Sequence, residues 1–477
     1  MTEYEAVIGL EVHVQLKTKT KAFCGCSTEF GKEPNTQVCP ICLGFPGVLP
    51  VLNRTALDYA IKVALALNCK IHSPTKFDRK NYFYPDLPKN YQISQYDLPL
   101  SYDGFLDIDL DGKDKHIRIR RVHLEEDAGK LIHKESTSLV DFNRAGIPLL
   151  EIVSEPDINS PEEAYQYLVT LKSIIQYLDV SDCDMEKGSL RCDANISLRK
   201  KNTIEFGTKI ELKNMNSFKA VKDALTYEIE RQKSLLSKNK AIVQETRFWD
   251  TKELKTFPMR TKEEAMDYRY FPDPDLPMFI ITQEKIQQIR ESIPELPREK
   301  IQRFIKDYGL SLYVAKILVS SKKDADFAES CLKAYPNKDK KTLVNWLIGP
   351  LLQEANTRGC GLADLGITPQ GLNELLGFVE KELISNLVAK SVLTEIIEKH
   401  KSAATIIQEG NLIQISDTES LEKIAKKVIQ ENPRSVQDYK GGKNNAIMFL
   451  VGQVMKKSQG KANPKIAQEL LKRLLNE

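Results

Sequence analysis

Residues 1–290 contain short runs of alternating polar and apolar residues, separated by glycine, proline, asparagine and aspartate. In residues 7–16 the apolar side chains recur at every second position, which predicts a β-strand with one buried face. Residues 54–67 are rich in alanine and leucine, and residues 161–178 begin with a serine followed by Pro161. Both patterns predict helices. The first part of the chain is therefore expected to be one large α+β domain.

The pattern changes at residues 270–297, which are punctuated by proline and predict stiff connectors. Residues 298–405 then show helical periodicity, and strand signals nearly vanish. A second boundary is expected at 411–418, where Ser416 and Glu419 have the spacing of a capping box. We therefore predict a multidomain α+β protein with a mixed α/β domain at 1–292, a helical domain at 293–410 and a small helical tail at 411–477.

Composition restricts the class of protein. A chain of 477 residues is too long for one ordinary core, and 41% hydrophobic with 28% charged residues is typical of a globular protein. We find no apolar run of about 18 residues and no secretory signal, so a cytoplasmic or organellar location is expected. A net charge of +3 neither demands nor excludes a nucleic-acid partner. Nine cysteines, an odd number, suit a reducing compartment.

Four cysteines form two close pairs, Cys24 with Cys26 and Cys39 with Cys42. Four thiolates at this spacing can surround Zn²⁺ tetrahedrally, which predicts a structural zinc site. The first pair has one intervening residue instead of the commoner two. The alternative is a set of four buried or redox-active thiols.

Carboxylates and one histidine recur in strand-like segments. Glu11 and His13 fall on the same face of the first predicted strand. Glu151 stands inside an apolar run and Asp193 alternates with small apolar residues, so both are expected to be half-buried or buried. Buried carboxylates need a partner or a cation, and converging carboxylates suit Mg²⁺ that holds nucleotide phosphates. The alternative is a solvated sheet face with local salt bridges. The candidate residues are Glu11, His13, Glu125, Glu126, Glu151 and Asp193.

Three further segments combine basic residues with features of RNA-binding surfaces. In residues 77–86, basic groups next to aromatic rings suit phosphate pairing and base stacking, although an aromatic turn packed on the core fits equally well. The charged stretch 209–217 lines the same cleft or faces water. Residues 440–477 hold eight Lys or Arg against two Glu, which suits contacts with RNA phosphates, although a merely soluble basic helix fits equally well on composition. The candidate tRNA contacts are Lys440, Lys443, Lys456, Lys457 and Lys461.

Absent motifs narrow the chemistry. The chain has no G-x4-G-K-[ST] phosphate loop and no G-x-G-x-x-G dinucleotide turn. It also lacks the short signatures of class I aminoacyl-tRNA synthetases and a Gly/Ser-rich amidase stretch. Any use of ATP must therefore rely on metal held by carboxylates, and any hydrolysis of glutamine must occur on another chain.

Several long motifs, in order along the whole chain, resemble the B subunits of bacterial and organellar aspartyl/glutamyl-tRNA(Asn/Gln) amidotransferases. The resemblance implies a cradle-shaped catalytic domain, a helical domain and a tail of the YqeY type. It also implies a heterotrimer in which the A subunit (GatA) hydrolyses glutamine and the C subunit (GatC) joins A to B. The motifs are residues 7–16, 77–85, 123–130, 151–157, 188–195, 267–272 and 449–453.

The resemblance further implies a ligase that uses ATP and Mg²⁺ to phosphorylate the side-chain carboxylate of Glu-tRNA(Gln) or Asp-tRNA(Asn), after which ammonia displaces the phosphate. On this basis Lys80, Ser189 and Arg191 are expected to bind ATP. The expected Mg²⁺ ligands, directly or through water, are Glu11, His13, Glu126 and Glu151. Asp193 and Glu125 are expected to complete the site or to guide ammonia.

Two functions of other classes remain open on the sequence alone. An RNA-binding chaperone or adaptor would turn over no ATP and need no metal. A freestanding ligase of the aminoacyl-tRNA synthetase type would join a free amino acid to RNA without partner chains. The sequence also leaves open whether Glu-tRNA(Gln), Asp-tRNA(Asn) or both are used.

Overall fold

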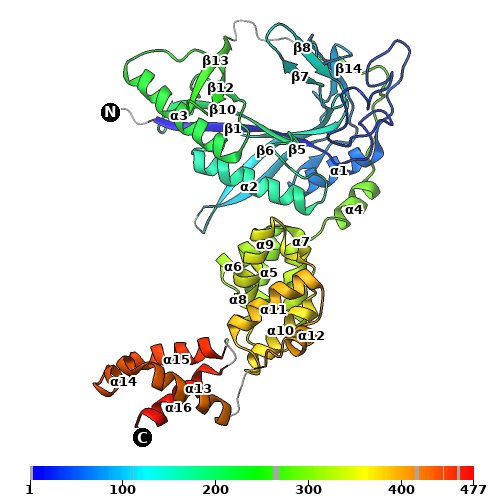
Figure 1. The fold of residues 1–477 in the computed structure, drawn as a ribbon. Helices are drawn as coiled ribbons and strands as arrows, with labels where there is room; N and C mark the ends of the chain where they lie inside the picture. The colour runs from blue at the N-terminus through cyan, green and yellow to red at the C-terminus, as the bar shows by residue number, and fades with distance from the viewer. Residues whose placement is uncertain are drawn as a thin grey trace. The chain divides into compact units, whose positions relative to one another are not determined.

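The computed structural model describes residues 4–110, 112–261, 268–413, 418–443, 445–458 and 462–476. The chain forms two compact units, Met1–Leu296 and Pro297–Glu477 (Figure 1). The first unit is mixed α/β and the second is helical. The predicted fold class is therefore confirmed, whereas the finer division into three domains stays a prediction.

A large sheet forms the centre of the first unit. Within the described residues it has nine strands in the order β13-β12-β11-β10-β1-β9-β6-β5-β2, and neighbours are antiparallel except β11 and β12. Its strands are β1 (Tyr4–Gln15), β2 (Lys70–Ile71), β5 (Ser101–Leu110), β6 (Lys113–Glu126), β9 (Pro148–Ser154), β10 (Leu190–Lys200), β11 (Ile210–Lys213), β12 (Glu245–Asp250) and β13 (Lys255–Thr261).

The alternation predicted for the first strand is confirmed. Leu10, Val12 and Val14 are buried in the core, whereas Glu11 and His13 between them lie on the opposite face and are partly exposed. Because the side-chain period of a strand is two residues, the pairing of β1 with its neighbours decides which polar side chains meet on that face.

Three helices pack against the apolar side of this unit. They are α1 (Arg54–Ala66), α2 (Pro161–Tyr177) and α3 (Phe218–Ser237), and Figure 1 shows α2 and α3 lying along the sheet. The two helices predicted from sequence are confirmed, including the N-cap of α2, where the Ser160 hydroxyl accepts from the backbone N–H of Glu163 at 3.2 Å. Helix α4 (Gln283–Glu291) completes the unit.

Two small sheets flank the large one. One has the order β14-β3-β4, and the other pairs β7 with β8. Phe77, which precedes β3, is buried and packs edge-on against Phe23, so this part of the aromatic segment belongs to the core. The strands are β3 (Asp78–Asn81), β4 (Tyr91–Ser94), β7 (Lys130–His133), β8 (Ser138–Asp141) and β14 (Phe271–Pro272).

The described part of the second unit contains helices and no strands. Among the described residues, no helix is both long and apolar enough to cross a lipid bilayer. The elements are α5 (Pro297–Tyr308), α6 (Leu312–Leu318), α7 (Lys322–Ala334), α8 (Lys341–Trp346), the π-helix η1 (Leu347–Leu351), α9 (Leu352–Arg358), the 3-10 helix η2 (Leu362–Leu365), α10 (Pro369–Glu380), α11 (Asn386–Lys399), α12 (Ala403–Glu409), α13 (Thr418–Glu431), α14 (Pro433–Lys440), α15 (Ala446–Lys457) and α16 (Pro464–Asn476).

The last helices have a hydrophobic cluster of their own. Leu421 of α13, Leu450 of α15 and Leu471 of α16 are buried together in it. Ser416 of the predicted capping box and Lys461 of the predicted tRNA contacts lie outside the described residues, as does Asp267 of the motif at 267–272.

Candidate active site

The register of four central strands gathers the predicted polar residues on one face of the sheet. On β1, Glu11 lies opposite Asp193 of β10, and His13 lies opposite Glu151 of β9. Glu151 in turn lies opposite His123 of β6. Directly opposite side chains of antiparallel strands are about 4.5–5.5 Å apart at Cβ, so these groups are forced into contact.

His13 lies at the centre of the first group. Its Nε2 atom lies 3.6 Å from Glu11 Oε1, 3.6 Å from Glu151 Oε2 and 3.9 Å from Glu125 Oε1. Potential ligand atoms of Glu11, His13 and Glu151 all lie within 4.8 Å of one another, which is the spacing that one metal ion can bridge. The structure thus brings three of the four predicted Mg²⁺ ligands together.

A second group, His123 with Glu125 and Glu151, shares Glu151 with the first. His123 Nε2 lies 3.2 Å from Glu151 Oε2 and 3.6 Å from Glu125 Oε2, and the Ser94 hydroxyl donates to Glu125 Oε2 at 3.1 Å. His123 was not among the site residues predicted from the sequence. Its position two residues before Glu125 repeats the spacing of Glu11 and His13, and this repetition was the signal that could have revealed it.

The two imidazoles compensate the charge of the buried carboxylates. Burial favours neutral His123, but the charges and close approach of Glu151 and Glu125 outweigh it and raise its pKa to about 9. The same balance, with Glu151 dominant over Glu125 and Glu11, raises the pKa of His13. Burial would raise the pKa of Glu151, but the two histidines hold it well below its ordinary value. The buried carboxylates of this cluster therefore need positively charged groups beside them.

Asp193 lies on the same face but outside both groups. Its carboxylate accepts from Lys213 Nζ at 2.5 Å, and Lys213 also lies 3.3 Å from Glu211. Of the two interpretations of segment 209–217, this contact supports the one in which the charged strand lines the cleft. Burial, followed by the charge of Glu151, raises the pKa of Glu11, although Lys213 acts in the opposite direction. The positive charge of Lys213 therefore does not fully compensate the negative charge of the carboxylates.

The predicted ATP-binding residues lie near the same cluster, although they do not touch one another in a single group. Lys80 is placed on β3, and its ammonium lies 4.9 Å from the centre of the Tyr268 ring. Burial opposes its charge, but Glu125, Tyr270 and Glu151 outweigh burial and raise the pKa of Lys80. These neighbouring carboxylates therefore favour the positively charged form of Lys80.

Arg191 and Ser189 lie toward the C-terminal end of β1. Arg191 is opposite His13 and donates to Asp127 at 2.9 Å, and Gln15 donates to the other Asp127 oxygen at 2.7 Å. The Ser189 hydroxyl accepts from the backbone N–H of Asp184 at 2.8 Å. The Arg191 guanidinium and the Ser189 hydroxyl therefore lie beyond the carboxylate cluster, toward the C-terminal end of β1.

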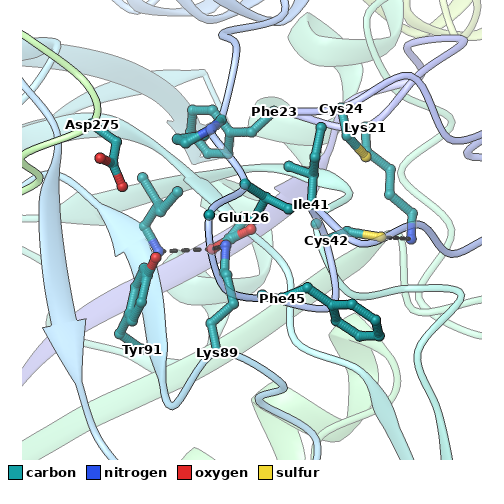
Figure 2. Close-up of a pocket in the computed structure, with 16 residues that line it drawn as sticks. Lys21, Phe23, Cys24, Ile41, Cys42, Phe45, Lys89, Tyr91, Glu126 and Asp275 are labelled. Atoms are coloured by element: carbon teal, nitrogen blue, oxygen red, sulfur yellow. Dashed lines mark hydrogen bonds and ion pairs between the residues drawn. The ribbon is translucent and has the colours of Figure 1, made fainter.

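Glu126 does not join either metal-ligating group of the described residues. Its carboxylate accepts hydrogen bonds from Lys89 and, at 2.9 Å, from the backbone N–H of Ile93. It borders a cavity of about 210 Å³ that is also lined by Lys21 and Cys42 (Figure 2). Because neighbouring residues of a strand point to opposite faces, Glu125 and Glu126 cannot both face His13.

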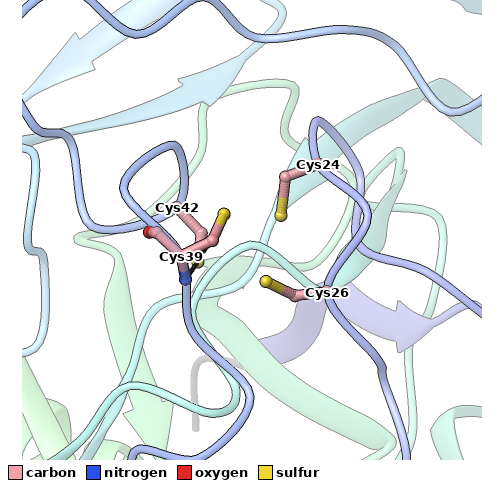
Figure 3. Close-up of side chains that lie close together, drawn as sticks. All are labelled: Cys24, Cys26, Cys39 and Cys42. Atoms are coloured by element: carbon pink, nitrogen blue, oxygen red, sulfur yellow. Dashed lines mark hydrogen bonds between the residues drawn. The ribbon is translucent and has the colours of Figure 1, made fainter.

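The four cysteines converge as predicted, with all four sulfurs within 4.8 Å of one another (Figure 3). The Cys39 and Cys42 sulfurs are 3.9 Å apart, close to the value of about 3.8 Å that Zn–S bonds of 2.3 Å require in a tetrahedron. The Cys39 N–H donates to Cys42 Sγ at 3.2 Å. The buried Lys21 ammonium lies 3.7 Å from the same sulfur, and hydrogen bonding from Cys24 lowers the pKa of Cys42 to about 4. This group can hold a thiophilic metal ion.

The basic residues of the C-terminal helices are not equivalent. Lys443 pairs with Asp438 at 2.8 Å, and Lys457 pairs with Glu431 at 2.8 Å. Lys440 and Lys456 are exposed. Two of the predicted tRNA contacts thus already have an acidic partner.

Comparison with known proteins assigns the chain to a family. Residues 6–287 match the model of the GatB/GatE catalytic domain, and residues 326–475 match that of the GatB domain. The chain therefore belongs to the GatB/GatE family. It is 56% identical to the B subunit of the aspartyl/glutamyl-tRNA(Asn/Gln) amidotransferase of Caldanaerobacter subterraneus subsp. tengcongensis over the full length of both chains.

Two further relatives with that name are similar over nearly the whole chain. The protein of Persephonella marina is 54% identical over 99% of this chain and 100% of its own. The protein of Brevibacillus brevis is 52% identical over 100% of both. The resemblance deduced from the motifs is confirmed.

The raised pKa of His123 predicts a pH-dependent contribution to stability. Its folded pKa of about 9 exceeds the ordinary value of 6.5, so the contribution is complete below about pH 6.5 and is lost as the pH rises through about 9. In metal-free protein, His123→Gln should lower the free energy of unfolding by on the order of 2 kcal/mol at about pH 6, and by much less at about pH 9.5.

Denaturant titrations at both pH values measure this difference. The control is His116→Gln, which changes an exposed histidine of the same strand and should cost less than about 1 kcal/mol at either pH. An equal loss for His123→Gln at both pH values would show that His123 is neutral in the folded chain.

Proposed function

We propose that this chain is the B subunit of an aspartyl/glutamyl-tRNA(Asn/Gln) amidotransferase. In this proposal it phosphorylates the side-chain carboxylate of Glu-tRNA(Gln), Asp-tRNA(Asn) or both at the expense of ATP, and ammonia then replaces the phosphate. Membership of the GatB/GatE family supports the proposal. The observation that carries it is the convergence of Glu11, His13 and Glu151 on one face of the central sheet.

The chemistry requires activation because a carboxylate is a poor electrophile. A carboxylate oxygen of the substrate attacks the γ-phosphorus of ATP, and the bond to the β,γ-bridging oxygen breaks to release ADP. Ammonia then attacks the carbonyl carbon of the acyl phosphate, and inorganic phosphate leaves with the C–O bonding electrons. Phosphoryl transfer depends mainly on positioning and charge neutralisation, which fixed cationic groups provide.

The donor set fits Mg²⁺. Glutamate oxygens of Glu11 and Glu151 are the hard ligands that this ion prefers, and we assign His13 as a ligand directly or through water. Bound Mg²⁺ would neutralise phosphate charge in the transition state. We leave Glu126 out of this ligand set because its carboxylate is held by Lys89 and the Ile93 N–H.

Other residues of the chain would position the phosphates and the reacting carboxylate. Lys80, whose positive charge is favoured by Glu125 and Glu151, is suited to contact the transferred phosphoryl group. Arg191 supplies guanidinium donors farther along the sheet, where we assign the remaining phosphates of ATP. The Ser189 hydroxyl, which accepts from the Asp184 N–H and donates to Asp182, is assigned to the same region. Asp193, beside Glu11, would guide ammonia or order Lys213.

The proposal includes two partner chains, a glutaminase chain and a smaller chain that joins it to this one, which the family calls the A and C subunits. The relatives are named as B subunits, which favours a multi-subunit enzyme over a freestanding ligase. The convergent metal-ligating groups favour catalysis over a passive RNA adaptor. We further propose that the four cysteines hold structural Zn²⁺ and that residues 411–477 form a separate tRNA-binding tail, for which the cluster around Leu450 is the structural support.

The central test is the conversion of Glu-tRNA(Gln) to Gln-tRNA(Gln) by the reconstituted three-subunit complex with ATP, Mg²⁺ and glutamine. His13→Ala should lower kcat by on the order of a thousandfold, because it removes a group at the centre of the charged cluster. Affinity for tRNA, measured by filter binding, should stay within about twofold.

His116→Ala, which alters an exposed histidine on β6, is the control and should retain wild-type turnover. Near-normal turnover of His13→Ala would refute the assigned site. A wild-type complex that binds Glu-tRNA but releases no ADP would instead favour the adaptor function.

The zinc proposal predicts about one zinc ion per chain in elemental analysis of the purified protein. Replacing Cys39 and Cys42 by serine should release the ion and lower the melting temperature, because structural zinc contributes directly to folding. Cys331→Ser changes a cysteine outside the cluster and should leave the zinc content unchanged. A metal-free wild-type protein, with unchanged melting in the double variant, would contradict the proposal.

The tail proposal predicts a loss of salt-dependent tRNA affinity. Replacing Lys440 and Lys456 by glutamine should reduce the slope of log affinity against log salt by about 1 to 2, since each phosphate contact contributes roughly 0.7–0.9. Lys381→Gln, outside the proposed tail, serves as the control. Unchanged slopes for the double variant, measured over the same salt range, would assign these lysines to solubility alone.

A further inference from the structure

A second cavity, of about 230 Å³, opens on the same side of the central sheet as the carboxylate cluster. Its walls come from the N-terminal half of β1, the adjoining parts of β9 and β10, and the loop after β10. Gly9 lies two residues before Glu11 and opposite Asn195, so both face the cluster side of the sheet. Two strand residues span about 6.6–6.8 Å, which places Gly9 immediately beside the proposed reaction centre.

Gly9 is a strand residue that the protein itself does not require to be glycine. A Cβ atom built at Gly9 would meet no atom closer than 3.8 Å, the backbone oxygen of Ser154. Glycine inside a strand costs stability, and it commonly marks a place where a ligand approaches the backbone closely. Glycine at position 9 is therefore not needed to avoid a clash within the protein. Its lack of a side chain enlarges the cavity.

Three polar side chains in this cavity have no recorded partner among the described residues. The structure records no hydrogen bond for the side chains of Asn195 and Ser197 within the described residues, and both line the cavity. Lys209, at the same cavity, is exposed and has no ion pair among the described residues. The neighbouring Ser154 hydroxyl, by contrast, accepts from the Leu10 N–H at 2.9 Å. An amide, a hydroxyl and an ammonium are thus available to a bound molecule.

Phe206 supplies an exposed aromatic wall. Its side chain is 64% exposed, and Arg199 lies 6.0 Å from the ring centre. The next residue, Gly207, lies so close to β10 that a Cβ atom would come within 2.1 Å of the Leu198 oxygen. This close approach leaves no space for a side chain at position 207, so the backbone next to Phe206 packs directly against β10. Aromatic rings of this kind stack on nucleobases.

We propose that this cavity binds the 3′-terminal nucleoside of the charged RNA, an inference that rests on the proposed function. The base stacks on Phe206, the ribose faces Asn195 and Ser197, and Lys209 meets the adjoining phosphate. Its volume is below the roughly 300–1,000 Å³ of pockets for drug-sized ligands and suits one nucleoside.

The position of the cavity favours RNA over the nucleoside of ATP as its occupant. Arg191, which we assign to ATP, lies opposite His13, toward the C-terminal end of β1. Gly9 lies on the other side of Glu11, toward the N-terminal end. Phosphoryl transfer needs its donor and acceptor roughly in line, so the two substrates must approach the cluster from opposite sides. The amino acid attached to the RNA would then extend from the cavity to the cluster.

Steady-state kinetics of the three-subunit complex separate these occupants. Gly9→Val fills the cavity floor with a side chain that favours strands, and Phe206→Ala removes the stacking wall. Each should raise the KM for Glu-tRNA about tenfold while leaving kcat and the KM for ATP within about twofold. Ile204→Ala, an exposed residue of the same loop outside the cavity, is the matched control and should change neither KM.

A direct measurement of ligand affinity tests the nucleoside site without relying on turnover. The probe is adenosine carrying glutamate through a stable 3′-amide, titrated calorimetrically into the complex without ATP. The wild-type and Ile204→Ala complexes should bind it, and both cavity variants should bind it about tenfold more weakly at unchanged melting temperature.

The possible outcomes are distinct. A raised KM for ATP with an unchanged KM for RNA would assign the cavity to the nucleotide and overturn the proposal. Unchanged constants and unchanged probe affinity would also overturn it, even with normal amidation. If the wild-type complex amidates no tRNA, the proposed function fails, whereas selective loss of probe binding in the variants would still support the nucleoside site.

Discussion

The antiparallel pairing of β1 with β9 and β10 is the constraint on which the site depends. It places His13 opposite Glu151 and Glu11 opposite Asp193, and a slip of one residue would move every one of these groups to the apolar side. The slip is prevented because Leu10 and Val12, on the other face, are buried in the core. The same burial that stabilises the sheet therefore holds the charged groups in register.

Bringing three glutamates together inside a protein is unfavourable without compensating charge. Here the surrounding carboxylates raise the pKa of His13 and of His123, which favours the imidazolium forms that supply this charge. A divalent ion would meet the same demand. The cluster is thus stabilised by the histidines and is suited to bind a cation. The cavity beside Gly9 provides space for a substrate on the same side of the sheet.

Local signals in the sequence predicted much of this arrangement. Strand alternation predicted the face shared by Glu11 and His13, and cysteine spacing predicted the convergence seen in the structure. Which other strands would supply partners is decided by long-range pairing, which local periodicity does not encode. His123 was therefore missed, and Glu126 was assigned to the cluster although it projects to the other side of β6, toward Lys89.

The location of a bound divalent ion tests the proposed site most directly. Crystals of the complex grown with Mn²⁺ in place of Mg²⁺ would reveal the ion by its anomalous scattering. We expect a peak between the carboxylates of Glu11 and Glu151, with His13 bound to the ion directly or through one water. A peak at Glu126 instead, or none on this face of the sheet at saturating Mn²⁺, would contradict the assignment.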